Sequence, residues 1–150
     1  MYMSRWSSVL SIAIALTACT NSLDPKTVPG AYTLNDINGR PLPTYEAPTP
    51  GLTRTIRSAG LSIDFGGTAE LTLAVTQFDG TQATITMHYT YRLKDHDLIF
   101  ASPCPPDANC LAPPKGRVLS TGDIELDIGS AEFPIVYHFR RITTGIMEGN

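Results

Sequence analysis

The chain has 150 residues, of which 42% are hydrophobic and 17% charged, and its formal net charge is −3. This length predicts a single domain, and the hydrophobic fraction is sufficient for an ordinary core and too high for a disordered chain. The weakly acidic balance excludes the basic stripe that nucleic-acid binding requires and the polybasic patch that attracts an anionic membrane surface, so we expect no nucleic-acid partner.

Residues 1–18 have the composition of a secretory signal peptide. Arg5 supplies the positive charge, residues 9–16 form the apolar run, and small residues follow. The run is too short to cross a bilayer as a helix, which needs about 20 residues, although a short N-terminal membrane helix is the less favoured alternative. We therefore expect residues 1–18 to be removed on export.

The segment Leu16-Thr17-Ala18-Cys19 resembles the bacterial lipoprotein box, in which cleavage occurs just before the cysteine. The resemblance implies that Cys19 becomes the mature N-terminus, with a diacylglycerol on its sulfur and usually an acyl chain on its amine. Each buried methylene contributes about 0.8 kcal/mol, so two or three chains anchor a protein stably. Thr20, rather than Asp, follows the cysteine, which in Gram-negative families favours the outer membrane. We expect a lipid-anchored protein of the bacterial cell envelope, at the outer membrane and facing the periplasm.

Residues 19–29 are expected to form the lipidated N-terminus and a flexible tether. They are mostly polar, contain Pro25 and Pro29, and show no apolar periodicity. Ten extended residues reach at most roughly 33–36 Å, enough to hold a small domain clear of the lipid. The domain itself is expected at residues 30–142, followed by a polar tail at residues 143–150 that frays.

From Ala31 onward, apolar and polar residues alternate with period two, which is typical of strands that bury one face. The turn signals Asn38-Gly39, Gly66-Gly67 and Asp79-Gly80 separate the alternating segments. Residues 44–51 and the Pro-rich residues 102–116 are predicted to be loops. The pattern predicts an all-β fold, an antiparallel up-and-down meander of about seven to nine strands that forms a small barrel or half-barrel. Strands are expected within residues 31–35, 61–65, 69–76, 84–93, 98–101, 124–128 and 133–140.

The clearest strand alternates over ten residues. One face is predicted to be buried, and the other is predicted to face water. The buried stripe comprises Ile85, Met87, Tyr89, Tyr91 and Leu93, and the wet face comprises Thr84, Thr86, His88, Thr90 and Arg92.

The segment PGAYTLNDINGRPLP at residues 29–43 resembles the opening of small bacterial lipocalin-like lipoproteins. That family begins with a Gly-x-Tyr-x-Leu strand, followed by Ile-Asn-Gly and a Leu-Pro pair. The resemblance extends over about residues 29–142 and implies a lipocalin-like barrel. It implies no chemistry, because the family is mostly without assigned function, and the cysteine-containing loop departs from its pattern. The matching positions are Gly30, Tyr32, Leu34, Ile37, Asn38, Gly39, Leu42, Pro43, Gly60, Leu61, Ile63, Asp79, Gly80, Thr81 and the closing segment at residues 137–141.

Cys104 and Cys110 lie close together in the Pro-rich loop. Two nearby thiols of an exported protein meet oxidising conditions, so we expect a structural disulfide. A loop this small gains about 2 kcal/mol of stability from closure in the chain-entropy model. A redox pair and a metal site are the alternatives, but the spacing is not Cys-x-x-Cys and no histidine lies within the loop.

Four aromatic residues on two of the predicted strands are candidates for lining a cavity: Tyr89, Tyr91, Tyr137 and Phe139. The interior of an eight-stranded barrel is either filled by side chains or holds one small ligand. Core packing is the favoured interpretation, and a ligand cavity is the alternative.

No recognisable catalytic motif is present: the sequence contains neither Gly-x-Ser-x-Gly nor His-Glu-x-x-His nor a phosphate-binding loop. His88 and His138 are expected to be solvated strand residues, because a metal site would need a third ligand such as Glu70 and no ligand spacing supports one. The segment Asp95-His96-Asp97 is expected to be a charged turn, and a cation site is the less favoured alternative. We expect no catalytic residue, metal or cofactor. The sequence predicts a lipid-anchored envelope module that binds a small apolar ligand or an envelope protein, and a small envelope enzyme with an unrecognised site is the alternative.

Overall fold

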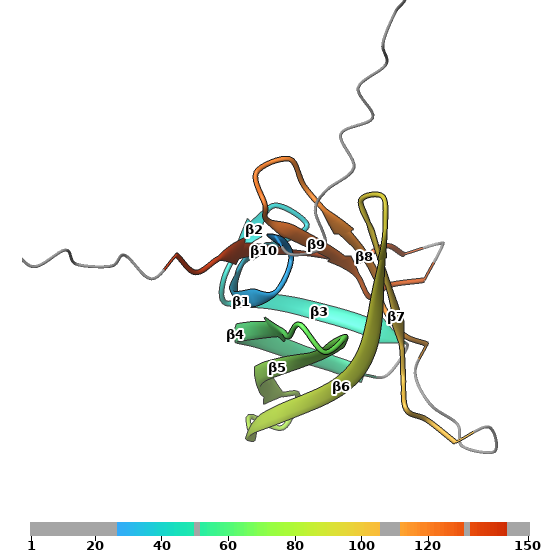
Figure 1. Cartoon of the computed structure of the whole chain (residues 1–150). Helices are drawn as coiled ribbons and strands as arrows, with labels where there is room; N and C mark the ends of the chain where they lie inside the picture. The colour runs from blue at the N-terminus through green and yellow to red at the C-terminus, as the bar shows by residue number, and fades with distance from the viewer. Residues whose placement is uncertain (1–26, 50–51, 106–111, 131–132, 144–150) are drawn as a thin grey trace, which may run out of the picture.

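The computed structural model describes residues 27–49, 52–105, 112–130 and 133–143. This part of the chain is antiparallel β structure (Figure 1). In the described residues, we find no helix long and apolar enough to cross a membrane. The strands are β1 (Gly30–Ile37), β2 (Arg40–Pro41), β3 (Thr44–Thr49), β4 (Leu52–Ile63), β5 (Thr68–Gln77), β6 (Gln82–Lys94), β7 (Asp97–Ala101), β8 (Lys115–Val118), β9 (Ile124–Asp127) and β10 (Val136–Arg141).

Eight of these strands form a closed barrel, which confirms the predicted up-and-down β architecture. Strands β4 to β10 pair in sequence order, and β1 closes the ring by pairing with β10 on one edge and β4 on the other. The short strand β2 extends the sheet beyond β1 through the predicted Asn38-Gly39 turn, where both residues have positive φ (51° and 73°). Only residues that tolerate the left-handed region make this tight hairpin, which explains why Asn-Gly marks it.

Two strands share the edge of β4 that faces away from β5. Residues 60–63 of β4 pair with β1, and residues 54–56 pair with β3. As a result, the barrel is closed at the end where β4 terminates, whereas β3, β4, β5 and the first half of β6 continue beyond the ring as an open sheet.

The alternating residues of the barrel strands meet in one interior core, because successive side chains of a strand point to opposite faces. The OH of Tyr32 is satisfied there by the carbonyl of Val28 at 2.5 Å. The largest fully buried side chains are those of Tyr32, Tyr137, Phe139, Ile56, Leu61, Leu71, Leu73, Leu98, Ile124 and Leu126.

Three expectations from the sequence are corrected. Residues 44–49 form strand β3 rather than a loop, and β8 begins at Lys115 within the segment expected to be Pro-rich loop. Phe65 and Phe133 continue the alternating pattern of their segments but lie in turns beyond the strands and are 81% and 73% exposed. Period-two alternation reports the face of a residue only within the ladder, and β4 ends at Ile63, before Phe65, whereas β10 begins only at Val136, after Phe133.

The alternation of β6 is confirmed, but its apolar stripe is half-buried rather than buried. Strand β7 pairs with β6 only from Thr90 to Lys94. The residue that would follow opposite His88 is Pro103, which has no N–H and cannot extend a ladder. Among the described strands, the first half of β6 therefore pairs on the β5 side alone.

A buried polar cluster joins β3, β4 and β10 inside the protein. The carboxylate of Glu46, which is 4% exposed, accepts hydrogen bonds from Arg54 Nε at 2.5 Å and from the Tyr137 OH at 2.5 Å. Burial and the neighbouring Glu46 charge raise the pKa of Tyr137, so its hydroxyl remains a donor. A buried carboxylate is costly unless such donors satisfy it.

We predict that Tyr137→Phe lowers the free energy of unfolding by about 1–3 kcal/mol, because it leaves a buried carboxylate oxygen without its donor. Tyr91→Phe is the matched control, since the Tyr91 OH donates to the exposed carbonyl of Asp64 at 2.8 Å. Loss of that bond should change stability by no more than about 0.5 kcal/mol. Urea unfolding measures both values, and equal losses would contradict the role given to Glu46.

Candidate functional site

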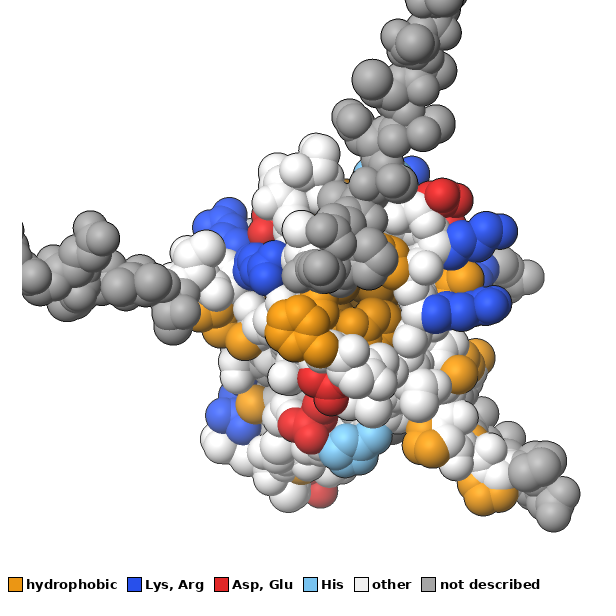
Figure 2. All heavy atoms as spheres, in the orientation of Figure 1, with side chains coloured by type: hydrophobic (Ala, Val, Ile, Leu, Met, Phe, Trp, Pro, Cys, Tyr) orange, Lys and Arg blue, Asp and Glu red, His pale blue; other side chains and the backbone are white. Residues whose placement is uncertain are grey.

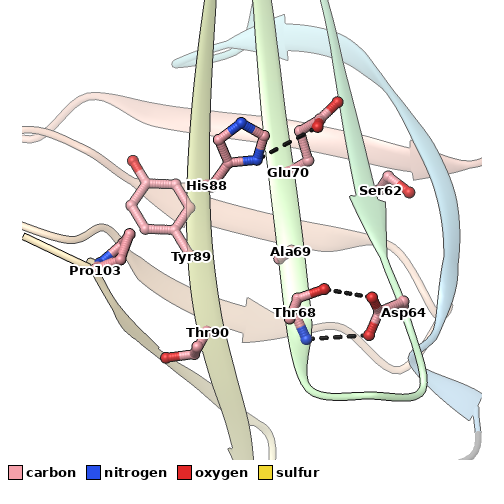
Figure 3. A pocket seen from close by; sticks show the side chains of 9 residues that line it. All are labelled: Ser62, Asp64, Thr68, Ala69, Glu70, His88, Tyr89, Thr90 and Pro103. Atoms are coloured by element: carbon pink, nitrogen blue, oxygen red, sulfur yellow. Dashed lines mark hydrogen bonds and ion pairs between the residues drawn. The ribbon is translucent and has the colours of Figure 1, made fainter.

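An open pocket of about 490 Å³ lies over the ends of β4 and β5 that adjoin the β4–β5 turn and over the middle of β6 (Figure 3). In the same region, Figure 2 shows acidic side chains next to a histidine, below a group of hydrophobic side chains. The pocket is lined by Ser62, Asp64, Thr68, Ala69, Glu70, His88, Tyr89, Thr90 and Pro103.

Strand register places the polar lining side chains in two rows on the outer face of the barrel. Ser62, Glu70 and His88 are cross-strand partners on β4, β5 and β6. Thr68 and Thr90 form the next pair toward the turn. His88 Nδ1 and Glu70 Oε2 are 3.4 Å apart, and because both side chains are largely exposed this ion pair contributes little to stability.

Asp64 builds one rim of the pocket. Its carboxylate accepts hydrogen bonds from the backbone N–H of Gly66 at 2.7 Å and of Thr68 at 3.1 Å, and from the Thr68 hydroxyl. The bonds from Thr68 and Gly66 stabilise the charged form and hold the pKa of Asp64 below its usual value. The rim is therefore an ordered, negatively charged turn.

The opposite side of the pocket is apolar. Tyr89 packs edge-on against Phe100, with ring centroids 5.7 Å apart, and Pro103 lies beside it (Figure 3). The two polar rows point to the opposite face of β6 from Tyr89, so the pocket combines an oxygen-rich outer face with an apolar strand edge. Such a lining suits a small ligand that presents hydrogen-bond donors.

The order of the residues does not form a nucleophilic triad. Glu70 lies between Ser62 and His88, so the two outer residues are separated by two strand spacings, or about 10 Å. A base activates a serine only within hydrogen-bonding distance. Ser62 is therefore not positioned for activation by His88.

A second pocket, of about 350 Å³, lies at the opposite end of the same strands, beside the β5–β6 turn. It contains apolar side chains of β5 and β6 and the guanidinium of Arg54, which is already paired with Glu46. Its lining residues are Thr53, Arg54, Val75, Gln77, Phe78, Asp79 and Ile85.

The four aromatic candidates separate into two pairs. Tyr137 and Phe139 lie in the packed core, with 0% and 1% exposure, and their rings are in contact. Tyr89 and Tyr91 are half-buried on β6, and Tyr89 lines the 490 Å³ pocket. The structure does not bring the four together around one cavity, because the two strands belong to different parts of the wall.

His138 was expected to be solvated, but the structure places it in a cluster with two carboxylates. Its Nδ1 lies 3.3 Å from Asp36 Oδ1 on β1, and its Nε2 lies 2.6 Å from Glu125 Oε1 on β9. Partial burial disfavours the charged imidazole, but the hydrogen bonds and charges of Glu125 and Asp36 outweigh it and raise the pKa of His138. Only the strand register, which no spacing in the sequence reveals, could have shown this cluster.

Three further expectations concern the cysteines and metals. Cys19 and Cys110 lie outside the described residues, so lipidation and the Cys104–Cys110 disulfide stay predictions. Among the described residues, no group of three or more His, Cys, Asp or Glu side chains is arranged to hold a metal ion.

Comparison of the chain with protein-family models, curated proteins and solved structures finds no match. The resemblance to small lipocalin-like lipoproteins therefore stays a prediction, while the barrel itself is established by the strand pairing.

We predict that His138 makes stability depend on pH near neutrality. Because its pKa is raised on folding, the stabilisation is fully present below its unfolded value of 6.5 and is lost as pH rises through the folded value. From about pH 6 to pH 8 the free energy of unfolding of the wild type should fall relative to that of His138→Gln, because glutamine does not titrate in this range. Urea unfolding at both pH values measures the difference, and parallel pH profiles for the two proteins would contradict it.

Proposed function

We propose that this protein is a lipid-anchored binding module of the bacterial cell envelope, whose pocket over β4, β5 and β6 takes a small ligand rich in hydrogen-bond donors. The observation that carries the proposal is the oxygen-rich lining of that pocket, to which two carboxylates and three hydroxyls contribute beside one aromatic side chain. Hydroxyl and ammonium groups share the donor chemistry that this lining accepts.

The packed interior favours a ligand on the outer face over carriage of an apolar molecule inside the barrel. Tyr32, Tyr137 and Phe139 occupy the space that an enclosed ligand would need. The pocket over β4–β6 instead combines polar edges with a single apolar wall, which fits a small polar molecule better than a lipid. No arrangement of described residues specifically favours the enzymatic alternative.

The position of the N-terminus supports an orientation toward the membrane. Gly30 pairs with Ile63 at the end of β4, and Arg141 Nη2 holds the Pro29 carbonyl at 2.8 Å. The chain therefore enters the barrel at the end that carries Asp64 and the pocket. Val28 is buried in the core, so the tether expected at residues 19–29 is corrected at its end: only residues 20–26 are left to span from Cys19, and they would keep this end within roughly 23–25 Å of the lipid surface.

We predict saturable binding of a donor-rich probe by the lipidated protein in detergent. Two probes distinguish the sources of donors: methyl α-glucoside carries hydroxyls only, and putrescine carries ammonium groups. Binding should shift the backbone amide resonances of Glu70, His88 and Thr90. If the donors are ammonium groups, Glu70→Gln should weaken binding about tenfold, equivalent to about 1.4 kcal/mol, and raised salt should weaken it further.

Asp97→Asn is the control for the probe experiment, because Asp97 is an exposed carboxylate at the start of β7, outside the pocket lining. It should leave the affinity unchanged. Absence of saturable shifts with either probe, or equal effects of the Glu70 and Asp97 substitutions, would overturn the assignment of the pocket.

We predict that Cys19→Ala prevents lipidation and cleavage at the lipoprotein box. The variant should lack the acyl chains, which labelling of cells with a radioactive fatty acid detects directly. It should also retain residues 1–18, which mass spectrometry of the product measures. Incorporation of label into the Cys19→Ala protein, or a mature N-terminus elsewhere in the wild type, would show that the anchor assignment is wrong.

A further inference from the structure

The first half of β6 has an unpaired edge. Residues 82–90 pair with β5 on one side, but on the other side β7 joins only from Thr90 onward. Figure 1 shows the chain that follows β7 leading toward the lower right, away from this half of β6, which runs toward the lower left. Among the described residues, no strand pairs with residues 82–89 on this side.

The backbone groups that point to this edge follow from the hydrogen bonds on the other side. The N–H of Tyr91 donates to the carbonyl of Gly67, next to β5, at 2.8 Å. Backbone direction alternates along a strand, and the register between β5 and β6 has no bulge. The N–H and C=O groups directed to the free edge are therefore those of Gln82, Thr84, Thr86 and His88.

The edges of β3 and β2 are protected against pairing with another strand, but the edge of β6 is not. Strand β3 contains Pro48 and an irregular register between Glu46 and Thr49, and β2 is only two residues long and includes Pro41. Residues 82–91 contain no Pro, Gly, Lys, Arg, Asp or Glu. Proteins usually blunt an exposed edge with such residues, so a long uncharged edge indicates a surface that pairs with another strand.

We propose that the β6 edge binds the β6 edge of a second copy of this chain. A two-fold axis beside Ile85 aligns the two strands antiparallel, with Thr84 opposite Thr86 and Gln82 opposite His88 of the partner. In this register the backbone N–H and C=O groups of all four edge-directed residues of each copy form hydrogen bonds, and the two open sheets become continuous. It also brings the half-buried Ile85 side chains of the two copies together on the inner face.

The chain itself is the occupant that fits this edge best. Each copy presents an extended, uncharged strand that is already ordered, so pairing costs little conformational entropy. No like charges meet, because the paired segments carry none. The contact spans only seven residues of each strand, which is below the extent of an ordinary stable interface, so we expect a weak dimer that forms among copies concentrated on one membrane.

Two tagged copies of the full chain, produced in the same cells, test the dimer by co-purification from detergent-solubilised membranes. The wild-type copies should co-purify. Two copies carrying T84K and T86K should co-purify at least tenfold less, and so should two copies carrying T84E and T86E, because like charges then meet across the axis. One lysine copy with one glutamate copy should restore co-purification. The cross-strand neighbours of these positions are Ala74 and Thr72, so the single copies should fold normally.

Crosslinking in intact cells gives an independent measurement. Thr86→Cys should form dimers with a short bismaleimide, whereas Thr72→Cys, one strand further from the edge on the same face, should not. Equal crosslinking at the two positions, undiminished co-purification of the lysine copies, or failure of wild-type copies to associate would overturn the proposal. None of these outcomes depends on ligand binding in the pocket.

Discussion

Closure of the barrel depends on β1, because its two edges join the last strand of the chain to β4. This pairing turns a linear meander into a ring, so that the alternating apolar residues of eight strands face one interior. Since β1 occupies only the second half of the β4 edge, β3 takes the first half and carries Glu46 inward, opposite Tyr137. The buried polar cluster is thus a consequence of how β4 is shared. The same pairing fixes the N-terminus at the end of the barrel that carries the pocket.

Unequal strand lengths produce the two surfaces to which we assign functions. Strand β6 has 13 residues and its neighbour β7 has 5, and the ladder between them stops before Pro103. The second half of β6 pairs with β7 and belongs to the closed ring. The first half, which supplies His88 to the outer pocket, pairs with β5 alone among the described strands. The ladder that stops before Pro103 therefore accounts for the adjoining pocket wall and the available edge.

Each of the ionisable groups with a structural role is stabilised by its own local contacts, and the net charge of the protein does not reveal these contacts. Glu46 is stabilised by donors inside the protein, Asp64 by backbone N–H groups in a turn, and His138 by carboxylates on two neighbouring strands. The three environments differ: Glu46 is buried among hydrogen-bond donors, Asp64 accepts hydrogen bonds within a turn, and His138 lies partly exposed between two carboxylates. None of them follows from the composition of a chain with a formal charge of −3.

The sequence by itself determined the all-β class, the positions of the Asn38-Gly39 and Asp79-Gly80 turns and the alternating faces of β6, because each depends on local backbone preference or on period-two patterning. It also contains the lipoprotein-box resemblance at Cys19, which needs no folding to be recognised. It missed β3, whose strand residues include a proline, and it assigned Phe65 and Phe133 to strands that do not reach them. The grouping of Ser62, Glu70 and His88, and that of Asp36, Glu125 and His138, was decided only by tertiary structure. Each group unites residues from three strands, and the register that aligns them is set by closure of the whole barrel rather than by any local segment.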